Sequence, residues 1–460
     1  MHKIEKNLIP KEVFDTVGKI TNSGYECFIV GGAVRDLLLG RTTRDWDFTT
    51  NATPEQILEI FKDGYYNNTF GTVGIALEDS DLEPFEITTY RTESNYSDNR
   101  RPDKVSWGSS LEEDVSRRDF TINSMALQIG PDSSTEVIDH HHGLEDLKLK
   151  LIRTVGDADT RFKEDALRMM RAVRIATELG FKIEEKTESS IKHNAELINN
   201  ISKERVKEEL WKILAAPNPV DGVEKLISSG ICQIILPELL PSFEIDQKSP
   251  ERHHIDDVGT HLLKSLANCR SHDPLVRFAT LIHDIGKPQT HKILSSGVVT
   301  FYNHEVVGSR IAAKIAERLK FSKNESTKLF KLVRWHQFTV DENQTDSAIR
   351  RFIRNVGVEN IEDMLTLRIA DRLGGGARET SWRLEEFKKR LIEVQKQPFS
   401  VRDLKVTGND LMEALGIPQG KAVGIILNKL FSKVEAGELA NESEELLKKA
   451  KELQLEISRN

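Results

Sequence analysis

Short apolar stretches bounded by turn residues alternate with amphipathic stretches over the first 150 residues. Apolar runs rich in β-branched and aromatic residues predict strands, and apolar positions three and four apart predict helices. The predicted strands are CFIVGGAV (27–34), WDFTT (46–50), VGIAL (73–77), PFEITTYR (84–91) and MALQI (125–129). The predicted helices between them are KEVFDTVGKITNSG (11–24) and PEQILEIFKDG (54–64). The pattern therefore predicts a small α/β sheet domain over residues 1–150.

From about Asp157 onward the apolar positions follow a helical period. The predicted helices are RFKEDALRMMRAVRIATELG (161–180), TESSIKHNAELINN (187–200), KERVKEELWKIL (203–214) and VDGVEKLISSG (220–230). A second helical block, dense in histidine, covers residues 253–375, and QKQPFS (395–400) is a predicted linker before a helical tail. We therefore predict four domains: 1–150, 151–245, 246–394 and 395–460.

The composition is that of an ordinary soluble protein. The 460 residues are 38% hydrophobic and 30% charged, with a formal net charge of −8, so RNA binding would have to depend on local basic surfaces. Cys27, Cys232 and Cys269 are scattered and odd in number, which favours a reducing, cytoplasmic location over a disulfide framework. No apolar run approaches the ~20 residues that span a membrane, so we expect no membrane association.

The most informative segment runs from Gly31-Gly32 through Arg35-Asp36 to Asp45-Trp46-Asp47. On an extended strand, Asp45 and Asp47 would point to one side and Trp46 to the other. Two facing carboxylates repel unless a cation lies between them, and Mg²⁺ suits such oxygen ligands. The glycines would let backbone N–H groups approach a triphosphate. The combination indicates metal-assisted nucleotidyl transfer, whereas either motif alone would more simply be a turn or a solvated acidic loop.

Two further sets of polar residues follow in the same domain. Glu86, on a predicted strand, is either a third carboxylate of the site or a solvated strand residue. Arg117-Arg118-Asp119 and Asn123 open an apolar segment, and paired arginines suit phosphate oxygens or ribose hydroxyls. Alone, such a cluster is usually a surface feature. The polar stretch from Tyr90 to Leu111, with Arg100, Arg101 and Lys104, is predicted to be a mobile loop near the site.

Glu164, Asp165 and Arg168 stand at the start of a predicted helix. They could form an ordinary ion pair three residues apart. Alternatively, an aspartate that only accepts and an arginine that only donates match the edges of cytosine and adenine, which carry an amino group beside a ring nitrogen. Guanine and uracil reverse both groups, so this pair would accept CTP and ATP and reject GTP and UTP.

FIVGGAVRDLLLGRTTRDWDF, RRDFTINSMAL, EDALRMMRAVR and SKERVKEEL resemble, in order and spacing, the class II CCA-adding tRNA nucleotidyltransferases and their bacterial poly(A) polymerase relatives. The resemblance implies an α+β fold. A small α/β nucleotidyltransferase (polymerase beta-like) head would precede an all-α neck that binds RNA and the nucleotide base, an HD domain and a tRNA-binding tail.

The same resemblance implies roles for single residues. Asp45 and Asp47 would hold Mg²⁺, with Gly31, Gly32, Arg35 and Asp36 at the triphosphate. Arg117, Arg118, Asp119 and Asn123 would contact ribose and phosphates, and Asp165 and Arg168 would select the base, with Arg171 and Arg174 nearby. One departure is DHHHGLEDL (139–147), where family members usually read DPFGGLEDL. His140, His141 and His142 are interpreted as an adapted hinge rather than a metal site.

The histidine-rich block carries His261, His283-Asp284, His304, His336 and Asp371, all expected on helices. LIHDIGKPQTH and the order of these residues resemble the HD-domain phosphohydrolases. Imidazoles and carboxylates together suit Mn²⁺, Fe, Ni²⁺, Co²⁺ or Zn²⁺. The block is therefore either a hydrolase or a retained fold that only helps to hold tRNA.

The tail contains Gly416, Gly420 and Lys421 in a turn between predicted helices, which either meets an RNA phosphate or is a simple helix turn.

These observations predict a cytoplasmic, Mg²⁺-dependent enzyme that builds or repairs the 3′ CCA end of tRNA from CTP and ATP. The alternatives are a poly(A) polymerase or an enzyme that adds only A. The long Tyr90–Leu111 segment resembles that of family members that add A, which argues against an enzyme that adds only C. Rivals of other classes are an HD phosphohydrolase with a nucleotide-binding head and a non-enzymatic RNA-binding scaffold.

Overall fold

The computed structural model describes residues 4, 6–66, 71–77, 82–94, 104–107, 110–247, 256–338, 344–394 and 401–457. The chain divides into two compact units. The first comprises Met1–Pro241 and Ile315–Ser322, and the second comprises Ser242–Lys314 and Lys323–Asn460. The four domain boundaries predicted from the sequence remain predictions, and the linker 395–400 lies outside the described residues.

A seven-stranded sheet forms the centre of the head in the first unit. Its strand order is β3 (Tyr65–Tyr66), β4 (Thr72–Ile75), β5 (Phe85–Thr89), β2 (Asp47–Thr50), β1 (Cys27–Val30), β8 (Ala126–Ile129) and β9 (Thr135–Ile138). All five strands predicted from the apolar runs are present. β1 runs antiparallel to β2 and β8, while β2 runs parallel to β5 with Asp47 opposite Glu86. This register brings two acidic side chains to neighbouring strands.

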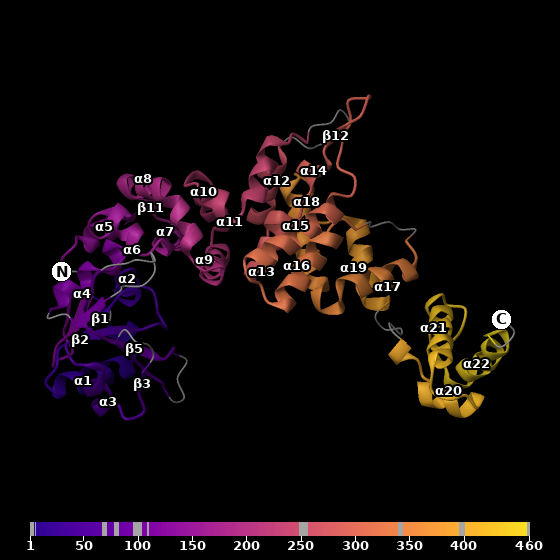
Figure 1. The fold of residues 1–460 in the computed structure, drawn as a ribbon, viewed down its shortest axis with the longest axis horizontal. Helices are drawn as coiled ribbons and strands as arrows, with labels where there is room; N and C mark the ends of the chain where they lie inside the picture. Colours follow the sequence, from indigo (N-terminus) through magenta and orange to yellow (C-terminus); the bar gives the residue numbers. More distant parts are fainter. Residues whose placement is uncertain are drawn as a thin grey trace. The chain divides into compact units, whose positions relative to one another are not determined.

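Both predicted head helices are present and cover the sheet. α1 (Lys11–Asn22) buries Val13, Val17 and Ile20, the apolar stripe that its period predicts, and packs against β1. α3 (Pro54–Ile60) begins with a Thr53 capping box and contacts β4, β5 and α1 (Figure 1). α2 (Gly32–Leu38) follows β1 directly, so the glycine turn leads from a buried strand into a helix.

Part of the polar stretch after Tyr90 is ordered as strands rather than loop. β6 (Arg91–Ser94) pairs antiparallel with β7 (Lys104–Trp107), and α4 (Leu111–Ser116) follows. Arg100 and Arg101 lie outside the described residues.

The region after the head is helical, as predicted, but its first helix is broken. α6 (Ala158–Glu164) ends at Asp165, whose φ of −140° and ψ of 106° are extended, and α7 (Leu167–Leu179) begins after it. The single helix predicted over 161–180 is therefore wrong at this point. The other α-helices and one short strand pair of this region are α5 (Gly143–Leu149), α8 (Glu185–Asn194), α9 (Lys203–Ala215), α10 (Pro219–Ser228), α11 (Ile231–Ile235), β10 (Leu151–Ile152) and β11 (Lys182–Ile183).

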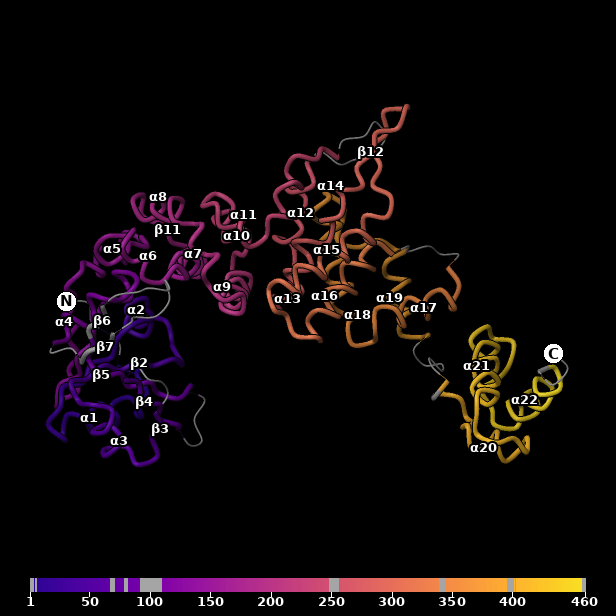
Figure 2. Tube along the Cα trace, viewed as in Figure 1, coloured from indigo at the N-terminus to yellow at the C-terminus, as the bar shows by residue number. Residues whose placement is uncertain are grey.

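The second unit contains a helical bundle around the histidines. α12, α13, α16 and α18 pack against one another (Figure 2). The helices and the hairpin of this region are α12 (Val258–Ala267), α13 (Pro274–Ile282), α14 (Lys287–Thr290), β12 (Lys292–Ile293), β13 (Val299–Thr300), α15 (His304–Arg318), α16 (Lys323–Trp335), α17 (Asp346–Val356), α18 (Ile361–Gly374) and α19 (Trp382–Val394).

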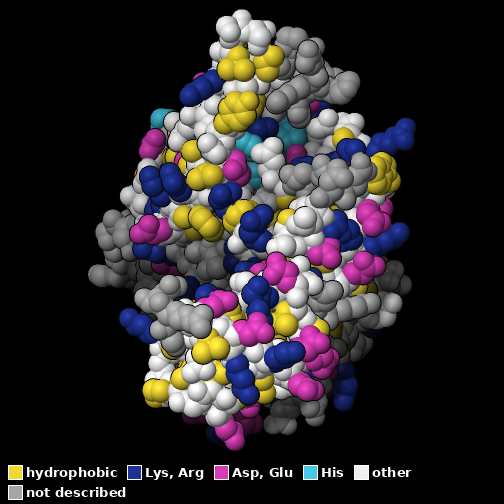
Figure 3. All heavy atoms as spheres, turned by 90° about the vertical axis from the view of Figure 1, so that its right-hand side faces the viewer, with side chains coloured by type: hydrophobic (Ala, Val, Ile, Leu, Met, Phe, Trp, Pro, Cys, Tyr) yellow, Lys and Arg dark blue, Asp and Glu magenta, His cyan; other side chains and the backbone are white. Residues whose placement is uncertain are grey.

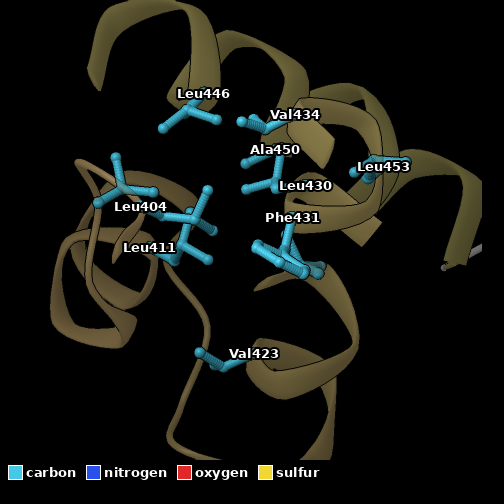
Figure 4. Packing of buried hydrophobic residues seen from close by; sticks show 11 residues of the cluster. Leu404, Leu411, Val423, Leu430, Phe431, Val434, Leu446, Ala450 and Leu453 are labelled. Carbon is cyan, nitrogen blue, oxygen red and sulfur yellow. The ribbon is translucent and has the colours of Figure 1, made fainter. Parts of the chain in front are cut away.

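The tail packs around its own apolar cluster. α20 (Gly408–Leu415), α21 (Lys421–Glu435) and α22 (Ser443–Ile457) contribute residues such as Leu411, Leu430 and Leu446, which are fully buried (Figure 4). Gly416 ends α20 in the left-handed conformation, at φ 64°, a conformation that glycine adopts without steric cost. The turn at Gly416–Lys421 is therefore a helix–helix connection, and its contact with RNA stays a prediction.

The fold class is as predicted: an α+β chain with a sheet-containing head and helical regions after it. No helix within the described ranges combines the length and the apolar character that crossing a membrane requires.

Candidate active sites

The glycine turn of the head separates a carboxylate from a guanidinium. Gly31 has φ 77° and ψ −144°, a conformation that residues with a Cβ rarely adopt. A Cβ at this position would lie 3.1 Å from Asp47 Oδ2 and 3.1 Å from Arg118 Nη1. Gly31 is therefore required both by the turn and by the close approach of these two charged groups.

The acidic residues meet at the start of β2. Asp47 is the first residue of the strand, and Asp45 precedes the strand rather than lying on it, so that part of the prediction is wrong. The alternation still holds, because Trp46 is fully buried while Asp45 is exposed and Asp47 is half-buried. Glu86 is exposed opposite Asp47 on β5.

Burial and charge repulsion both raise the pKa of Asp47. Burial, with the neighbouring carboxylates of Asp45 and Glu86, raises its pKa to about 6, although Arg118 and Arg171 oppose the shift. Carboxylates held together at this cost suit a divalent cation, which would offset their repulsion. Asp45 and Asp47 are thus the residues that fit Mg²⁺.

The raised pKa predicts how Asp47 affects stability without divalent cations. In the unfolded chain this carboxyl has its ordinary pKa of 3.8. Ionised Asp47 therefore lowers the stability of the folded head, and this penalty has its full size above pH 6. This penalty shrinks as the pH falls through about 6, because the folded state then binds a proton that the unfolded state does not. Asp47→Asn should therefore raise the melting temperature in EDTA at pH 8 and raise it less at pH 5.

Calorimetry at the two pH values measures this difference. The surface variant Asp15→Asn is the control, since Asp15 is exposed and lies 3.8 Å from Lys11. Added Mg²⁺ should stabilise the wild type more than Asp47→Asn. An equal pH dependence in wild type and Asp47→Asn would contradict the assignment.

A buried aspartate that the sequence analysis missed holds the arginine pair. Asp114, on α4, is fully buried and accepts hydrogen bonds from Arg117 Nε (3.1 Å) and Nη2 (2.7 Å) and from Thr49 Oγ1 (3.2 Å). The two Arg117 bonds go to Oδ1, whereas Oδ2 accepts from Thr49 and lies 3.6 Å from Arg118 Nη2. Burial would raise the pKa of Asp114, but the two arginines hold it below the ordinary value. In the sequence, the acidic run just before Arg117-Arg118 could have indicated a carboxylate partner for the two arginines.

Asp119 and Asn123 connect the head to the helices that follow. Arg171 donates to Asp119 Oδ2 from Nε at 2.8 Å and from Nη2 at 2.6 Å. Burial alone would raise the pKa of Asp119, but Arg171 outweighs it and holds that pKa at about 2. Asn123 donates to Asp119 and accepts from Arg35 Nη1 at 2.9 Å, while Arg35 also pairs with Asp36. These residues therefore form one network in the head.

Asp165 and Arg168 do not pair with each other. Because the chain is extended at Asp165, its carboxylate pairs instead with Arg205 Nη2 at 2.9 Å and also accepts from the Leu167 N–H. Arg168 donates to Glu164 Oε2 at 2.5 Å and to the Arg117 carbonyl at 3.2 Å. The ion pair expected as the alternative is thus formed between Arg168 and Glu164, four residues apart, and not between Arg168 and Asp165.

Arg174, the last arginine named from the sequence, lies elsewhere on α7. Its Nε is 3.3 Å from Glu209 Oε2, so it braces α7 against α9.

The six candidate metal ligands of the second unit converge, although they are up to 110 positions apart in the sequence. His261 Nε2 lies 3.3 Å from His283 Nε2 and 3.2 Å from Asp371 Oδ1. On the other side, His304 Nε2 lies 3.3 Å from His336 Nε2. Asp284 stands between the two pairs: its Oδ2 is 3.4 Å from His283, and its Oδ1 is 3.1 Å from His304.

All six residues were expected on helices, and this prediction is wrong for three of them. His261 and Asp371 are, and His304 opens α15, but His283 caps α13, Asp284 is in the following turn, and His336 follows the end of α16.

The histidine rings are oriented for coordination. The Nδ1 atoms of His283, His304 and His336 each lie 2.8 Å from a backbone carbonyl three residues earlier. An Nδ1–H that donates to these carbonyls leaves the Nε2 lone pair facing the cluster, as in metal-binding histidines. Two groups of donors lie within coordination reach: His261, His283 and Asp371, and His283, Asp284 and His336.

The buried charges of this cluster favour the binding of a cation. Burial lowers the pKa of His283, but Asp284 and Asp371 outweigh it and raise that pKa to about 10. Burial would raise the pKa of Asp284, but Lys287 and His283 hold it far below the ordinary range. A bound divalent cation would replace the protons that the buried imidazoles otherwise need. The donor set therefore fits a transition metal.

Lys287 was missed in the sequence although it follows in the same motif. Its Nζ lies 2.6 Å from Asp284 Oδ2 and donates to Gln247 Oε1 at 2.6 Å. Its position three residues after Asp284 was the available signal.

The three consecutive histidines of the head have a local structural role. His142 has φ 60° and starts α5, and the carboxylate of Asp139 accepts from the backbone N–H groups of Gly143 and Leu144. His141 Nε2 lies 3.0 Å from Ser116 Oγ. Within the described part of the chain, none of the three belongs to a group of potential metal ligands.

Three protein-family models match separate parts of the chain. They are the poly A polymerase head domain (residues 27–153), the "Probable RNA and SrmB- binding site of polymerase A" (180–243) and the tRNA nucleotidyltransferase domain 2 (305–450). The CCA-adding enzyme of Ligilactobacillus salivarius is 33% identical over 445 residues, covering 96% of both chains. The chain belongs to the CCA-adding enzyme family.

Other members support the same placement. The CCA-adding enzyme of Pediococcus pentosaceus is 33% identical over 97% of this chain and 99% of its own. The crystal structure of the Bacillus stearothermophilus CCA-adding enzyme in complex with CTP superposes with a TM-score of 0.71 at 28% identity, covering 98% of both chains. Nucleotidyltransferases of this family depend on a divalent metal.

Proposed function

We propose that this chain adds and repairs the 3′-terminal CCA of tRNA, using CTP and ATP and releasing pyrophosphate. The observation that carries the proposal is the similarity to a CCA-adding enzyme over 96% of the chain. The matched head domain, residues 27–153, spans the carboxylates and the glycine turn. The relative from Bacillus stearothermophilus was solved with CTP, and the matched tRNA nucleotidyltransferase domain supports tRNA as the substrate. The three cysteines are free and buried, which supports the expected reducing cytoplasm.

In the proposed reaction, the 3′ hydroxyl oxygen of the RNA forms a bond to the α-phosphorus of the nucleotide. The bond from that phosphorus to the pyrophosphate oxygen breaks, and the hydroxyl proton is released. Mg²⁺ bound by Asp45 and Asp47 would favour ionisation of the hydroxyl and offset the charge of the leaving pyrophosphate. Gly31 and Gly32 leave room for the triphosphate, and Arg118 and Arg35 supply positive charge beside it.

Base selection is assigned to Asp165 and Arg168. Their partners Arg205 and Glu164 fix the orientation of the carboxylate and the guanidinium. An acceptor beside a donor, both held in place, recognises the amino group and ring nitrogen shared by cytosine and adenine. Arg117, Asp119, Asn123 and Arg171 would contact the nucleotide or position the groups that do.

Asp165→Ala and Arg168→Ala test this assignment. Each should loosen base choice more than it weakens triphosphate binding, since a mismatched base leaves polar groups unpaired at roughly 1–3 kcal/mol each. The measurement is incorporation of each of the four nucleotides into tRNA that lacks CCA. Lys192→Ala, in the exposed pair with Glu188 on α8, is the control. Variants that exclude GTP and UTP as strictly as the wild type would show that other residues select the base.

A second candidate activity is metal-dependent phosphoester hydrolysis in the second unit. The specific observation that favours it is the convergence of His261, His283, Asp284, His304, His336 and Asp371. A transition metal held by these residues would generate a nucleophilic water near neutral pH. Lys287 holds Asp284 in place between the two histidine pairs.

A further inference from the structure

Two neighbouring cavities of the second unit share a wall of arginines. The first, of about 510 Å³, is lined by five of the six clustered ligands, with His283 beneath them. The second, of about 610 Å³, shares Gln337, Arg368 and Arg372 with the first and extends to Trp382 and Arg383. Figure 3 shows histidine side chains in a recess of this face, with lysine or arginine side chains beside them. A path therefore leads from the metal ligands past arginines to an aromatic residue.

Two arginines along this path, Arg372 and Arg383, are available to an anion, whereas Arg368 is paired with a carboxylate. Arg368 is fixed to the cluster, because its Nη1 donates to Asp371 Oδ2 at 2.9 Å. Arg372 donates from Nε to the Arg378 carbonyl, and within the described part of the chain it has no carboxylate partner. Arg383 likewise forms no ion pair there. Guanidinium groups that are not neutralised by protein carboxylates suit phosphate oxygens.

Trp382 provides an aromatic surface at the far end of the path. It is 62% exposed at the first residue of α19, while Leu384 and Phe387 of the same helix are buried and anchor it. The Arg383 guanidinium lies 5.3 Å from the centre of its ring. An isolated exposed tryptophan would be unremarkable on its own. An aromatic side chain beside unpaired arginines is, however, the combination that binds single-stranded nucleic acid by stacking and charge.

We propose that the histidine cluster binds the phosphorylated end of a single-stranded oligonucleotide and prefers it to a mononucleotide. The terminal phosphate lies at the cluster, the preceding internucleotide phosphate lies at Arg372, and a neighbouring base stacks on Trp382. This inference rests on the proposed hydrolytic function. In that hydrolysis, a water oxygen bonds to phosphorus, the bond to the ribose oxygen breaks, and the ribose oxygen takes up a proton.

The test compares cytidine 3′-phosphate with the 3′-phosphorylated dinucleotide CpCp in phosphate release by the full chain with Mn²⁺ or Ni²⁺. The wild type should show a lower KM for CpCp. Trp382→Ala should raise the KM for CpCp about tenfold, leave kcat unchanged and leave the mononucleotide unaffected. Trp382→Phe should restore most of the binding, because a phenyl ring still stacks. Arg372→Ala should also raise the KM for CpCp.

Two matched controls come from the same helix. Ile392→Ala removes a side chain that is 63% exposed on α19, and Lys389→Ala removes an exposed cation from it. Neither should alter KM.

Equilibrium binding separates this inference from the hydrolytic function. Fluorescence anisotropy of 5′-labelled CpCp should show tighter binding to the wild type than to Trp382→Ala. Binding that depends on Trp382 without hydrolysis would support the strand site and overturn the hydrolytic function. Hydrolysis with equal KM for both substrates, unchanged by Trp382→Ala, would overturn the strand site alone. Neither hydrolysis nor Trp382-dependent binding would overturn both.

Discussion

Asp47→Asn and Asp45→Asn are each expected to lower the rate of nucleotide addition at least about a hundredfold, while tRNA binding largely survives. Asparagine keeps the shape of the side chain but removes the charge that would hold Mg²⁺. Asp47 lies within a few ångströms of the Gly31 turn and shares its site with Asp45 and Glu86, so the variant loses the metal where charge develops in the transition state. The contacts expected to bind RNA lie on other residues, and these remain intact.

The measurement is single-turnover addition of labelled CTP to tRNA that lacks CCA, with gel-shift binding of the same tRNA. Asp15→Asn, on the surface of α1, is the matched control and should behave as the wild type. Addition by the Asp47 or Asp45 variant within about tenfold of the wild type would refute the metal assignment.

The combined variant His283→Gln and Asp284→Asn is expected to abolish phosphoester hydrolysis and leave nucleotide addition intact. Both side chains are buried within the cluster, and Asp284 stands between its two histidine pairs. Loss of these ligands should remove bound metal, which elemental analysis of the purified protein measures independently of activity. Hydrolysis of a 2′,3′-cyclic or 2′-phosphate nucleotide should fall at least about a hundredfold.

His272→Gln is the control, because His272 is exposed in the same unit and is not among the grouped ligands. Thermal unfolding shows whether the combined variant is folded, since Lys287 loses its buried carboxylate. Two results would contradict the account: no hydrolysis by the wild type with any divalent metal, or loss of nucleotide addition in a folded variant. Loss of nucleotide addition in a folded variant would indicate that the cluster has a structural role in holding tRNA.

Local pattern predicted the head well, because its strands are short apolar runs and its helices bury a regular stripe. The strands at Cys27–Val30 and Asp47–Thr50 and the helix at Lys11–Asn22 are examples. The break at Asp165 was not predictable in this way, because the apolar period continues from Phe162 through Ala166 and Met170 across it. An aspartate that accepts from the next turn can end a helix without any change in that period.

The other features that could not be predicted are contacts between residues distant in sequence. Pairings such as Asp165 with Arg205, Asp119 with Arg171 and Arg174 with Glu209 join residues 35 to 52 positions apart, which no local pattern encodes. The cluster around Asp284 could be named only because its residue order resembles a known family. Its geometry could be seen only in the folded structure. There Lys287 pairs with one oxygen of Asp284, and one histidine pair lies on each side of that residue.

The end product formed on tRNA tests the central claim most directly. The wild type is incubated with tRNA that lacks CCA and with each nucleotide alone, then with CTP and ATP together, and the 3′ ends are sequenced. We expect addition of two C residues with CTP alone and a complete CCA end with CTP and ATP. A homopolymer of A, or addition of A only to tRNA already ending in CC, would contradict CCA synthesis and identify the chain as a poly(A) polymerase or an A-adding enzyme.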